Sequence, residues 1–395
     1  MIGKRDLTLA FSAVGLIASL GYTSTRLERV AENQIGQIEA PLFEVDPLWP
    51  QPLPNQWILG SAVGVAVDSR DHIWMIHRQD TFDPRTESTA ANNPPTASCC
   101  IPAPPILEFD QAGNLISAWG GPGEGYDWPQ SNHGITIDHM DNVWIGGNGQ
   151  EDSQILKFAR DGTFLFQLGQ PRMRTGSNDT ENFWRVAKIS IDAEENEAYV
   201  ADGYGNKRVA VLDVLTGEMK RYWGAYGNRP DDALLPPYDP DDPPAQQFRS
   251  PLHCADISND RLVYACDRAS DRIQVFQSDG TFVREVFIEP ETLGSGSVWD
   301  IAFSPDEEQH FLYLADGLNR KIHVIERATM EVLTKFGAGG RQPGQFYGVH
   351  SIATDSDGNI YTTETWEGKR LQKFLYRGMG QVVADQGVVW PRPGG

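Results

Sequence analysis

Six copies of one strand pattern constrain the fold of this chain more than any other feature of its sequence. Each copy opens with a short run in which apolar residues alternate with small or polar ones, and it closes at Asp or Ser, where a turn is expected. A second and a third apolar strand follow, and turns such as Asp161-Gly162 and Asp279-Gly280 lead to a fourth. Asp-Gly between alternating strands is a strong hairpin signal. The opening runs lie at residues 64–68, 134–138, 188–192, 254–258, 300–304 and 351–355.

Six four-stranded units with almost no helical periodicity between them predict an all-β fold, a six-bladed β-propeller. The last unit lacks a fourth strand after Phe374, whereas Phe43–Asp46 near the N-terminus has no partner of its own. We expect this N-terminal strand to complete the sixth blade and close the ring, which removes the sheet edges. The propeller is predicted over residues 43–377, with a tether over 26–42 and a C-terminal tail over 378–395.

Two insertions interrupt the repeat, at residues 80–105 and 226–247. The first is rich in Thr, Asn, Pro and Ser, and the second in Pro and Asp. Both are predicted to be loops on a rigid scaffold. Each is expected either to cover a site or to be a passive surface excursion.

Residues 1–25 are predicted to be an export signal or an N-terminal anchor. Lys4 and Arg5 precede an uncharged, mostly apolar run from Leu7 to Tyr22. A basic start followed by an apolar stretch of this length is typical of export signals, and it is short for a membrane span. No small-x-small cleavage site follows, so the signal is either cleaved or kept as an anchor. We expect an exported protein, periplasmic or extracellular.

The acidic charge of the chain limits its partners. There are 33 basic and 54 acidic residues, which give a formal net charge of −21. A surface this acidic repels phosphate backbones and anionic lipid, so nucleic acid is not an expected partner and a membrane is expected only through the N-terminal anchor. The expected partner is a small-molecule or peptide substrate, and the oligomeric state stays open.

Four cysteines are too few for a disulfide scaffold, and they form no zinc-finger spacing. Cys254 and Cys266 lie on consecutive antiparallel strands, roughly opposite each other and within bridging distance. They are expected either to form a disulfide or to stay free. The same two alternatives stand for the adjacent pair Cys99 and Cys100.

One register position on the innermost strands predicts a metal site. The innermost strands of a propeller line its central tunnel, and histidine stands directly before the opening run in blades two, four and six. Alternate blades of a six-fold ring lie about 120° apart, so these imidazoles should converge on the axis. Three imidazoles with an open fourth position are the ligand pattern of catalytic zinc, with iron, copper or nickel as alternatives. The six residues at this position are Val63, His133, Ala187, His253, Trp299 and His350.

The chain also resembles two known families. Residues 266–276 and 337–361 look like the NHL repeat. From about Phe43 to Phe374 the chain resembles the catalytic core of peptidyl-α-hydroxyglycine α-amidating lyase, a six-bladed zinc propeller. That family cleaves the N–C bond of a peptidyl-α-hydroxyglycine to a peptide amide and glyoxylate. The resemblance implies that the three zinc ligands are His133, His253 and His350.

The same resemblance implies catalytic residues and a second cation. The family's substrate-binding arginine, in a strand ending His-Arg, matches Arg78, and its catalytic tyrosine, within Asp-Gly-Tyr, matches Tyr204. A second arginine of the family matches Arg268. An arginine can bind a carboxylate with two parallel hydrogen bonds, and a tyrosine can act as a base. A structural calcium of the family takes backbone carbonyls at positions that match Val65 and Ile135.

At four positions the chain departs from the family. Ser351 stands where the family has an Asp directly after its third zinc histidine, and Gly348 stands where it has Met. Gly205 and Val275 replace two cysteines. Because a neutral serine is a poor ligand for Ca²⁺, we expect calcium to be absent or weakly held. We also expect a roomier pocket at Gly348 and a preferred substrate other than a peptide ending in hydroxyglycine.

Three functions are consistent with these patterns. The first is an exported zinc-dependent lyase that cleaves the N–C bond of an N-acyl carbinolamide. The second is a metal-dependent hydrolase of esters or lactones, and the third is a non-catalytic exported binding scaffold with a structural metal. Arg78 and Tyr204 beside the metal favour the two enzymes, because a scaffold does not need convergent polar groups in its tunnel.

Overall fold

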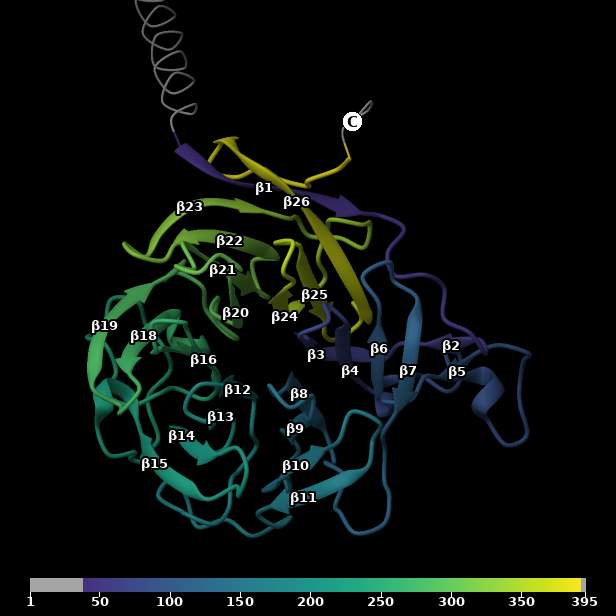
Figure 1. Ribbon diagram of the computed structural model, residues 1–395, viewed down its shortest axis with the longest axis horizontal. Helices are drawn as coiled ribbons and strands as arrows, with labels where there is room; N and C mark the ends of the chain where they lie inside the picture. The colour runs from purple at the N-terminus through teal and green to yellow at the C-terminus, as the bar shows by residue number, and fades with distance from the viewer. Residues whose placement is uncertain (1–37, 392–395) are drawn as a thin grey trace, which may run out of the picture.

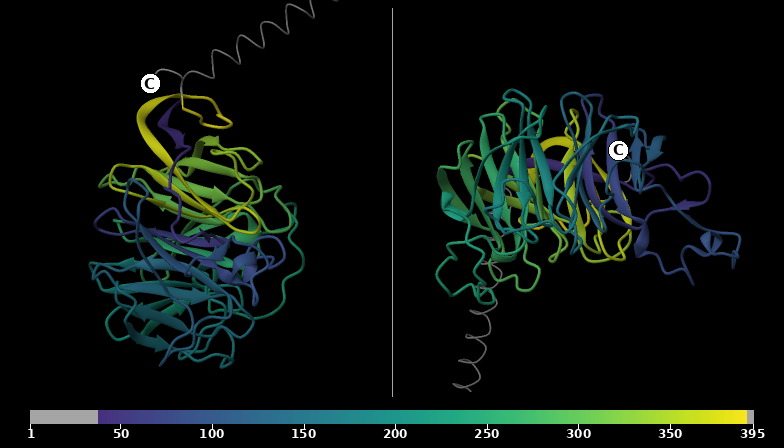
Figure 2. Two further views of the ribbon diagram at one scale, coloured as in Figure 1. Left: turned by 90° about the vertical axis from the view of Figure 1, so that its right-hand side faces the viewer. Right: turned by 90° about the horizontal axis from the view of Figure 1, so that it is seen from below.

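The computed structural model describes residues 38–391, and within them the regular structure is almost entirely β. Six four-stranded antiparallel sheets stand in a ring around a central axis (Figure 1). Seen from the side, the ring is a short disc whose strands run roughly along the axis (Figure 2). The predicted six-bladed β-propeller is therefore confirmed. The predicted export signal, residues 1–25, lies outside the described residues.

The blades share one strand order, in which the first strand of each repeat lies innermost. From the innermost strand outwards, blade one consists of β3 (Ser61–Val67), β4 (Ile73–Arg78), β6 (Ile106–Phe109) and β7 (Leu115–Trp119), and blade two of β8 (Asn132–Ile137), β9 (Val143–Gly147), β10 (Ile155–Phe158) and β11 (Phe164–Leu168). In the same order, blade three consists of β12 (Lys188–Asp192), β13 (Glu197–Asp202), β14 (Arg208–Asp213) and β15 (Met219–Trp223), and blade four of β16 (Leu252–Ile257), β17 (Leu262–Asp267), β18 (Arg272–Gln277) and β19 (Phe282–Phe287). Blade five consists of β20 (Asp300–Phe303), β21 (Phe311–Asp316), β22 (Lys321–Glu326) and β23 (Glu331–Phe336), and blade six of β24 (Val349–Thr354), β25 (Ile360–Glu364), β26 (Arg370–Val382) and β1 (Ile38–Asp46).

The Asp that closes an innermost run organises the turn to the second strand. One carboxylate oxygen of Asp68 accepts hydrogen bonds from the backbone N–H groups of Arg70 and His72, and the other accepts from the indole of Trp74 at 3.0 Å. Asp138 bonds Trp144 in the same way at 2.9 Å. The recurring Asp thus fixes both the turn and the large side chain that fills the space between neighbouring blades.

The ring is closed by its first and last strands. β1 pairs antiparallel with β26, from Ile38 opposite Val382 to Asp46 opposite Lys373. This confirms the predicted N-terminal closing strand, and Phe43 packs against Phe336 of blade five. The strands reach beyond the predicted limits of 43 and 377, because β26 runs on past its blade and pairs with the start of β1.

The insertions lie outside the ring of blades, whereas the cysteines are divided between the first insertion, which holds Cys99 and Cys100, and blade four, which holds Cys254 and Cys266. Residues 80–105 contain β5 (Ile101–Pro102), which pairs with β2 (Trp57–Ile58) in parallel, and the 3₁₀ turn η2 (Thr89–Ala91); η1 (Gln79–Thr81) leads into them. The 3₁₀ turn η3 (Ala225–Gly227) lies in the connection from blade three to blade four, and η4 (Arg268–Ser270) lies between β17 and β18 within blade four. The structure joins both cysteine pairs in disulfides, Cys254 to Cys266 with their Cα atoms 4.8 Å apart, and Cys99 to Cys100. Over residues 38–391, no helix has the length and apolar character needed to cross a membrane.

Candidate metal centre and its cavity

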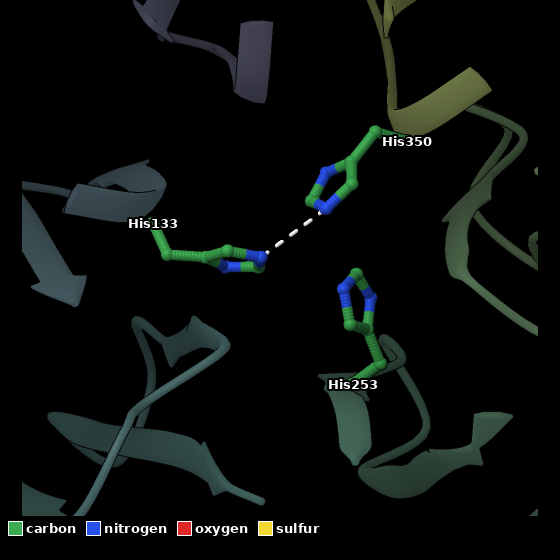
Figure 3. A group of neighbouring side chains, drawn as sticks. All are labelled: His133, His253 and His350. Carbon is green, nitrogen blue, oxygen red and sulfur yellow. Dashed lines mark hydrogen bonds between the residues drawn. The ribbon is translucent and has the colours of Figure 1, made fainter. Parts of the chain in front are cut away.

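The three predicted histidines meet at the axis of the ring (Figure 3). Each is the second residue of an innermost strand, His133 on β8, His253 on β16 and His350 on β24. In all three strands the pairing with the second strand shifts at the histidine. Such irregularities re-aim a side chain away from the regular alternation of a strand. One ligand atom of each histidine lies within 4.8 Å of the others.

Two backbone carbonyls set the orientation of the rings. Nδ1 of His133 donates to the carbonyl oxygen of Ala187 at 2.6 Å, and Nδ1 of His253 donates to that of Trp299. Ala187 and Trp299 occupy the histidine register in blades three and five, so the acceptors alternate with the donors around the tunnel. With Nδ1 carrying the proton, Nε2 keeps its lone pair, which is the form that binds a metal.

The nitrogen atoms that converge are suited to a metal ion. Burial lowers the pKa of His133, His253 and His350 well below the usual value, and nearby arginines add to the effect. The rings are therefore neutral at physiological pH. Nε2 of His133 lies 3.2 Å from Nε2 of His350, and nitrogens this close need a proton or a cation between them. Nδ1 of His350 is buried without a hydrogen-bond partner among the described residues.

Tyr204 reaches this group from a tight turn after β13. The buried Asp202 holds the turn, because its carboxylate accepts hydrogen bonds from Asn206 and Arg208. The Tyr204 hydroxyl lies 3.2 Å from Nε2 of His133 and 3.0 Å from Nε2 of His253. It also accepts a hydrogen bond from Nη1 of Arg268 at 3.1 Å.

Gly205, one residue further along, shows why the family's cysteine is absent here. A Cβ at this position would lie 2.4 Å from the ring of Trp184, so only glycine fits. The departure at Gly205 is therefore accounted for by packing.

The two predicted arginines stand on the same face of the ring as Tyr204. Arg78 ends β4, where its guanidinium donates to the carbonyl of Asn132 at 3.1 Å and to the amide oxygen of Asn148 at 2.7 Å. Arg268 follows β17 and stacks over the ring of Trp299, 4.4 Å from its centre. All of the predicted site residues except His253 line one cavity of about 430 Å³. His253 contacts the hydroxyl of Tyr204, which is part of the cavity wall.

Two residues of the site were not predicted. The guanidinium of Arg185 lies 5.6 Å from the centre of the Tyr204 ring, and its Nε donates to the backbone carbonyl of Asn148 at 2.7 Å. Asn148 therefore orients both Arg78 and Arg185. Asn148 could have been predicted from the sequence. It follows the second strand of blade two, at the repeat position that Arg78 occupies in blade one and Arg268 in blade four. Arg185 lies in an irregular segment before β12 and left no signal in the repeat.

Basic side chains outnumber acidic ones in the cavity wall, where Arg78, Arg268 and Lys369 lie with the single acidic residue Glu367. Within residues 38–391, no carboxylate forms an ion pair with Arg78, Arg185 or Arg268. Burial lowers the pKa of Arg78 and of Arg185, as expected for a guanidinium that is drawn from water without a carboxylate partner. Arg78 and Arg268 line the cavity and Arg185 lies against its Tyr204 side, so these groups together favour an anionic ligand, and a carboxylate suits them best.

The expected extra room at Gly348 is absent, which corrects that prediction. A Cβ on Gly348 would lie 2.6 Å from the ring of Trp366, which occupies the space. Trp366 packs in turn on Trp299, with ring centres 5.3 Å apart. The side chain that fills this part of the pocket comes from the turn after β25 and not from the strand that carries His350.

The residues at the implied calcium position do not suit a calcium ion. Val65 and Ile135 line the tunnel on the far side of the histidines, together with Lys188 and Asp256. The Lys188 ammonium lies between the carboxylates of Asp256 and Asp300. A positive group is thus already in place where a second cation would have to bind.

Fold and site together define a six-bladed β-propeller with a buried cluster of three histidines on its axis, beside a cavity walled by tyrosine and arginine. No protein-family model matches the chain. Peptidyl-alpha-hydroxyglycine alpha-amidating lyase 1 of Drosophila melanogaster is 26% identical over 362 residues, which covers 85% of this chain and 60% of that protein. Peptidyl-glycine alpha-amidating monooxygenase B of Xenopus laevis is 26% identical over 237 residues, covering 58% of this chain and 24% of that protein.

The chain therefore resembles the amidating lyase, as its motifs predicted, and it matches 60% of the length of the Drosophila relative. Among solved structures, a protein of unknown function from Bacteroides thetaiotaomicron superposes with a TM-score of 0.51 at 13% identity, over 86% of this chain and 77% of that chain. This likeness concerns the fold alone.

The unpaired arginines predict an unusual response of stability to mutation. Arg185→Met removes a poorly compensated charge, so we expect no decrease in the free energy of unfolding. Arg208→Met is the matched control, because Arg208 is fully buried and paired with Asp202 at 2.9 Å. Leaving the Asp202 carboxylate buried without its partner should lower the free energy of unfolding by roughly 3–5 kcal/mol. Urea unfolding of the two variants measures both values, and equal losses would contradict a ligand-binding role for Arg185.

Proposed function

We propose that this protein is an exported, zinc-dependent lyase that cleaves the C–N bond of an N-acyl carbinolamide bearing a carboxylate. One observation carries the proposal. Three neutral imidazoles converge through Nε2, and the Tyr204 hydroxyl touches two of them beside guanidinium groups that form no ion pair with any carboxylate of residues 38–391. A metal, a proton carrier and an anion site are the three parts that such a reaction needs. Export is supported by the basic and apolar pattern of residues 4–22.

His133, His253 and His350 are the residues that would hold the zinc ion. Three imidazole ligands leave one coordination position open, as in catalytic zinc sites. When bound, the ion supplies a Lewis acid that polarises a hydroxyl oxygen and lowers its pKa. The carbonyls of Ala187 and Trp299 keep two of the rings in the tautomer that this role requires.

The arginines orient the substrate. A guanidinium binds a carboxylate through two parallel N–H donors, which fixes direction as well as position. Asn148 holds Arg78 at 2.7 Å from its amide oxygen and Arg185 at 2.7 Å from its carbonyl, so the two guanidinium groups keep a fixed relation to each other. A bound carboxylate would compensate their charge and place the adjacent carbinol carbon near Tyr204.

Tyr204 carries the proton. As the carbinol O–H breaks, its proton passes to the phenol oxygen, and the phenol proton passes to the departing amide nitrogen. The electron pair of the C–N bond goes to nitrogen, and the O–H electrons form the new C=O bond. An N-acyl-α-hydroxyglycine would give an amide and glyoxylate, with no water consumed. Arg268, which donates to the Tyr204 oxygen at 3.1 Å, stabilises negative charge on that oxygen during the transfer.

The substrate class follows from the cavity and the relatives. The Drosophila relative is named for peptidyl-α-hydroxyglycine. In this chain Trp366 forms the cavity wall beside His350 and covers Gly348, so the space next to the third histidine is shaped by a tryptophan from the turn after β25. We therefore keep the prediction that the preferred substrate is another N-acyl carbinolamide rather than a peptide ending in hydroxyglycine.

The metal assignment is tested by removing one ligand. His253→Ala should lower zinc content to well below one ion per chain and abolish turnover of an N-acyl-α-hydroxyglycine, measured as glyoxylate release. His139→Ala is the control, because His139 is exposed in the turn between β8 and β9 and belongs to no group of possible metal ligands among the described residues. It should keep both metal and activity. Full zinc occupancy in His253→Ala would show that the metal lies elsewhere.

The role of Tyr204 is tested by removing only its hydroxyl. Tyr204→Phe should reduce kcat by about 10²-fold or more while zinc content stays unchanged. Tyr238→Phe removes a hydroxyl from the loop over 226–247, where it donates to Pro290, and should leave kcat as it is.

The choice of substrates separates the competing functions. Activity only on simple esters or lactones would favour a hydrolase over the lyase. A zinc-loaded protein that turns over neither class would favour a binding scaffold. Wild-type activity in Tyr204→Phe would remove this residue from the mechanism.

A further inference from the structure

We infer that Lys188 supplies a built-in cation on the tunnel axis, in place of a bound divalent ion, and that this ammonium fixes the strands that carry the three histidines. The inference concerns the side of the tunnel opposite the cavity. The contacts of Lys188 and of its partner Asp300 carry it, independently of the proposed reaction.

The ammonium of Lys188 is surrounded by oxygen atoms from two other blades. It lies 2.9 Å from a carboxylate oxygen of Asp256 in blade four and 2.6 Å from one of Asp300 in blade five. The backbone carbonyl of Ile301 completes the group at 3.3 Å. The Lys188 side chain is 14% exposed and that of Asp300 only 2%. Two carboxylates and a carbonyl are also the kind of oxygen ligands that Ca²⁺ binds.

Asp300 extends the network to two more blades. Its second carboxylate oxygen accepts a hydrogen bond from the Ser351 hydroxyl at 2.7 Å and from the backbone N–H of Ile352 at 3.1 Å. The Ser351 hydroxyl accepts in turn from the backbone N–H of Val65 in blade one, at 3.3 Å. One ammonium and one carboxylate thus connect blades three, four, five, six and one around the axis.

Three members of this network are direct chain neighbours either of a histidine of the cluster or of a residue whose carbonyl orients one. Lys188 follows Ala187, whose carbonyl accepts from His133. Asp300 follows Trp299, whose carbonyl accepts from His253. Ser351 follows His350 itself. The network therefore fixes the three strand segments on which the geometry of the metal centre depends.

The charges make Lys188 hard to replace by a neutral group. Burial by itself lowers the pKa of Lys188, but Asp256 and Asp300 outweigh it and raise that pKa above its usual range. Burial raises the pKa of Asp256 to about 6, against the effect of Lys188. Without the ammonium, two carboxylates would face each other in the tunnel, and such a pair either takes a proton or recruits a cation.

This arrangement also accounts for Ser351. A carboxylate at that position would add a third negative charge beside Asp300 and Asp256. A hydroxyl donates to Asp300 instead, which suits a tunnel whose cation is already covalently part of the chain. Ser351 is therefore compatible with the charge that Lys188 already supplies to the tunnel.

The test is to remove the ammonium and offer calcium. Lys188→Ala leaves space and two carboxylates, so the variant should have a lower Tm than wild type without calcium. Millimolar Ca²⁺ should then raise its Tm by about 5 °C or more, while the Tm of wild type stays unchanged. After dialysis the variant should retain calcium and wild type should not. If Lys188→Ala folds only with calcium, its refolding yield with and without the ion gives the same answer.

Two further variants separate a calcium site from general destabilisation. Lys157→Ala is the matched control, because Lys157 is a buried lysine that pairs with the single carboxylate of Asp138 at 2.9 Å. It should lose stability without recovering it in calcium. Lys188→Ala combined with Asp256→Asn should lose the calcium response. Stoichiometric calcium in wild type, or a folded Lys188→Ala that ignores calcium, would overturn the inference.

Discussion

The hydrogen bonds from Nδ1 of His133 and His253 to the carbonyls of Ala187 and Trp299 are the interactions on which the rest of the site depends. They commit the Nδ1 proton of each ring and leave Nε2 free to face the axis. The acceptors belong to the next blade in each case, so the orientation of a ring depends on how neighbouring blades are packed. The rigid ring of six sheets therefore does more than carry the histidines, since it also sets their tautomers.

The two sides of the tunnel use charge in opposite ways. Beside the cavity, Arg78, Arg185 and Arg268 have no carboxylate partner in the described part of the chain, which leaves their charge available to a ligand at a cost in stability. On the other side, the charge of Lys188 is fully engaged by Asp256 and Asp300. The first arrangement suits binding and the second suits a fixed scaffold, with the histidines between them.

The fold and the metal residues could be predicted from the sequence because both follow from the repeat. Six aligned runs define the innermost strands, and a single register position then places His133, His253 and His350 on one axis. The ring-closing strand at Phe43 followed from counting strands in the last blade. These inferences need only the periodicity of a strand and the symmetry of a ring.

The remaining parts of the site depend on contacts that no repeat encodes. Tyr204, Arg78 and Arg268 were identified through a resemblance, since their blades alone do not tell a site residue from a strand-end residue. Arg185 lies in an irregular segment, and its approach to Tyr204 depends on a backbone bond to Asn148. Trp366 fills the space at Gly348 from a different strand connection. Lys188 begins an aligned run, but its role depends on carboxylates from two other blades.

The most direct test of this account is X-ray absorption spectroscopy at the zinc edge on purified, zinc-loaded protein. We predict one zinc ion per chain with three imidazole nitrogens at about 2.0–2.1 Å and a further light-atom ligand. A folded protein that binds no zinc, or binds it through sulfur or carboxylate ligands alone, would contradict the account at its centre.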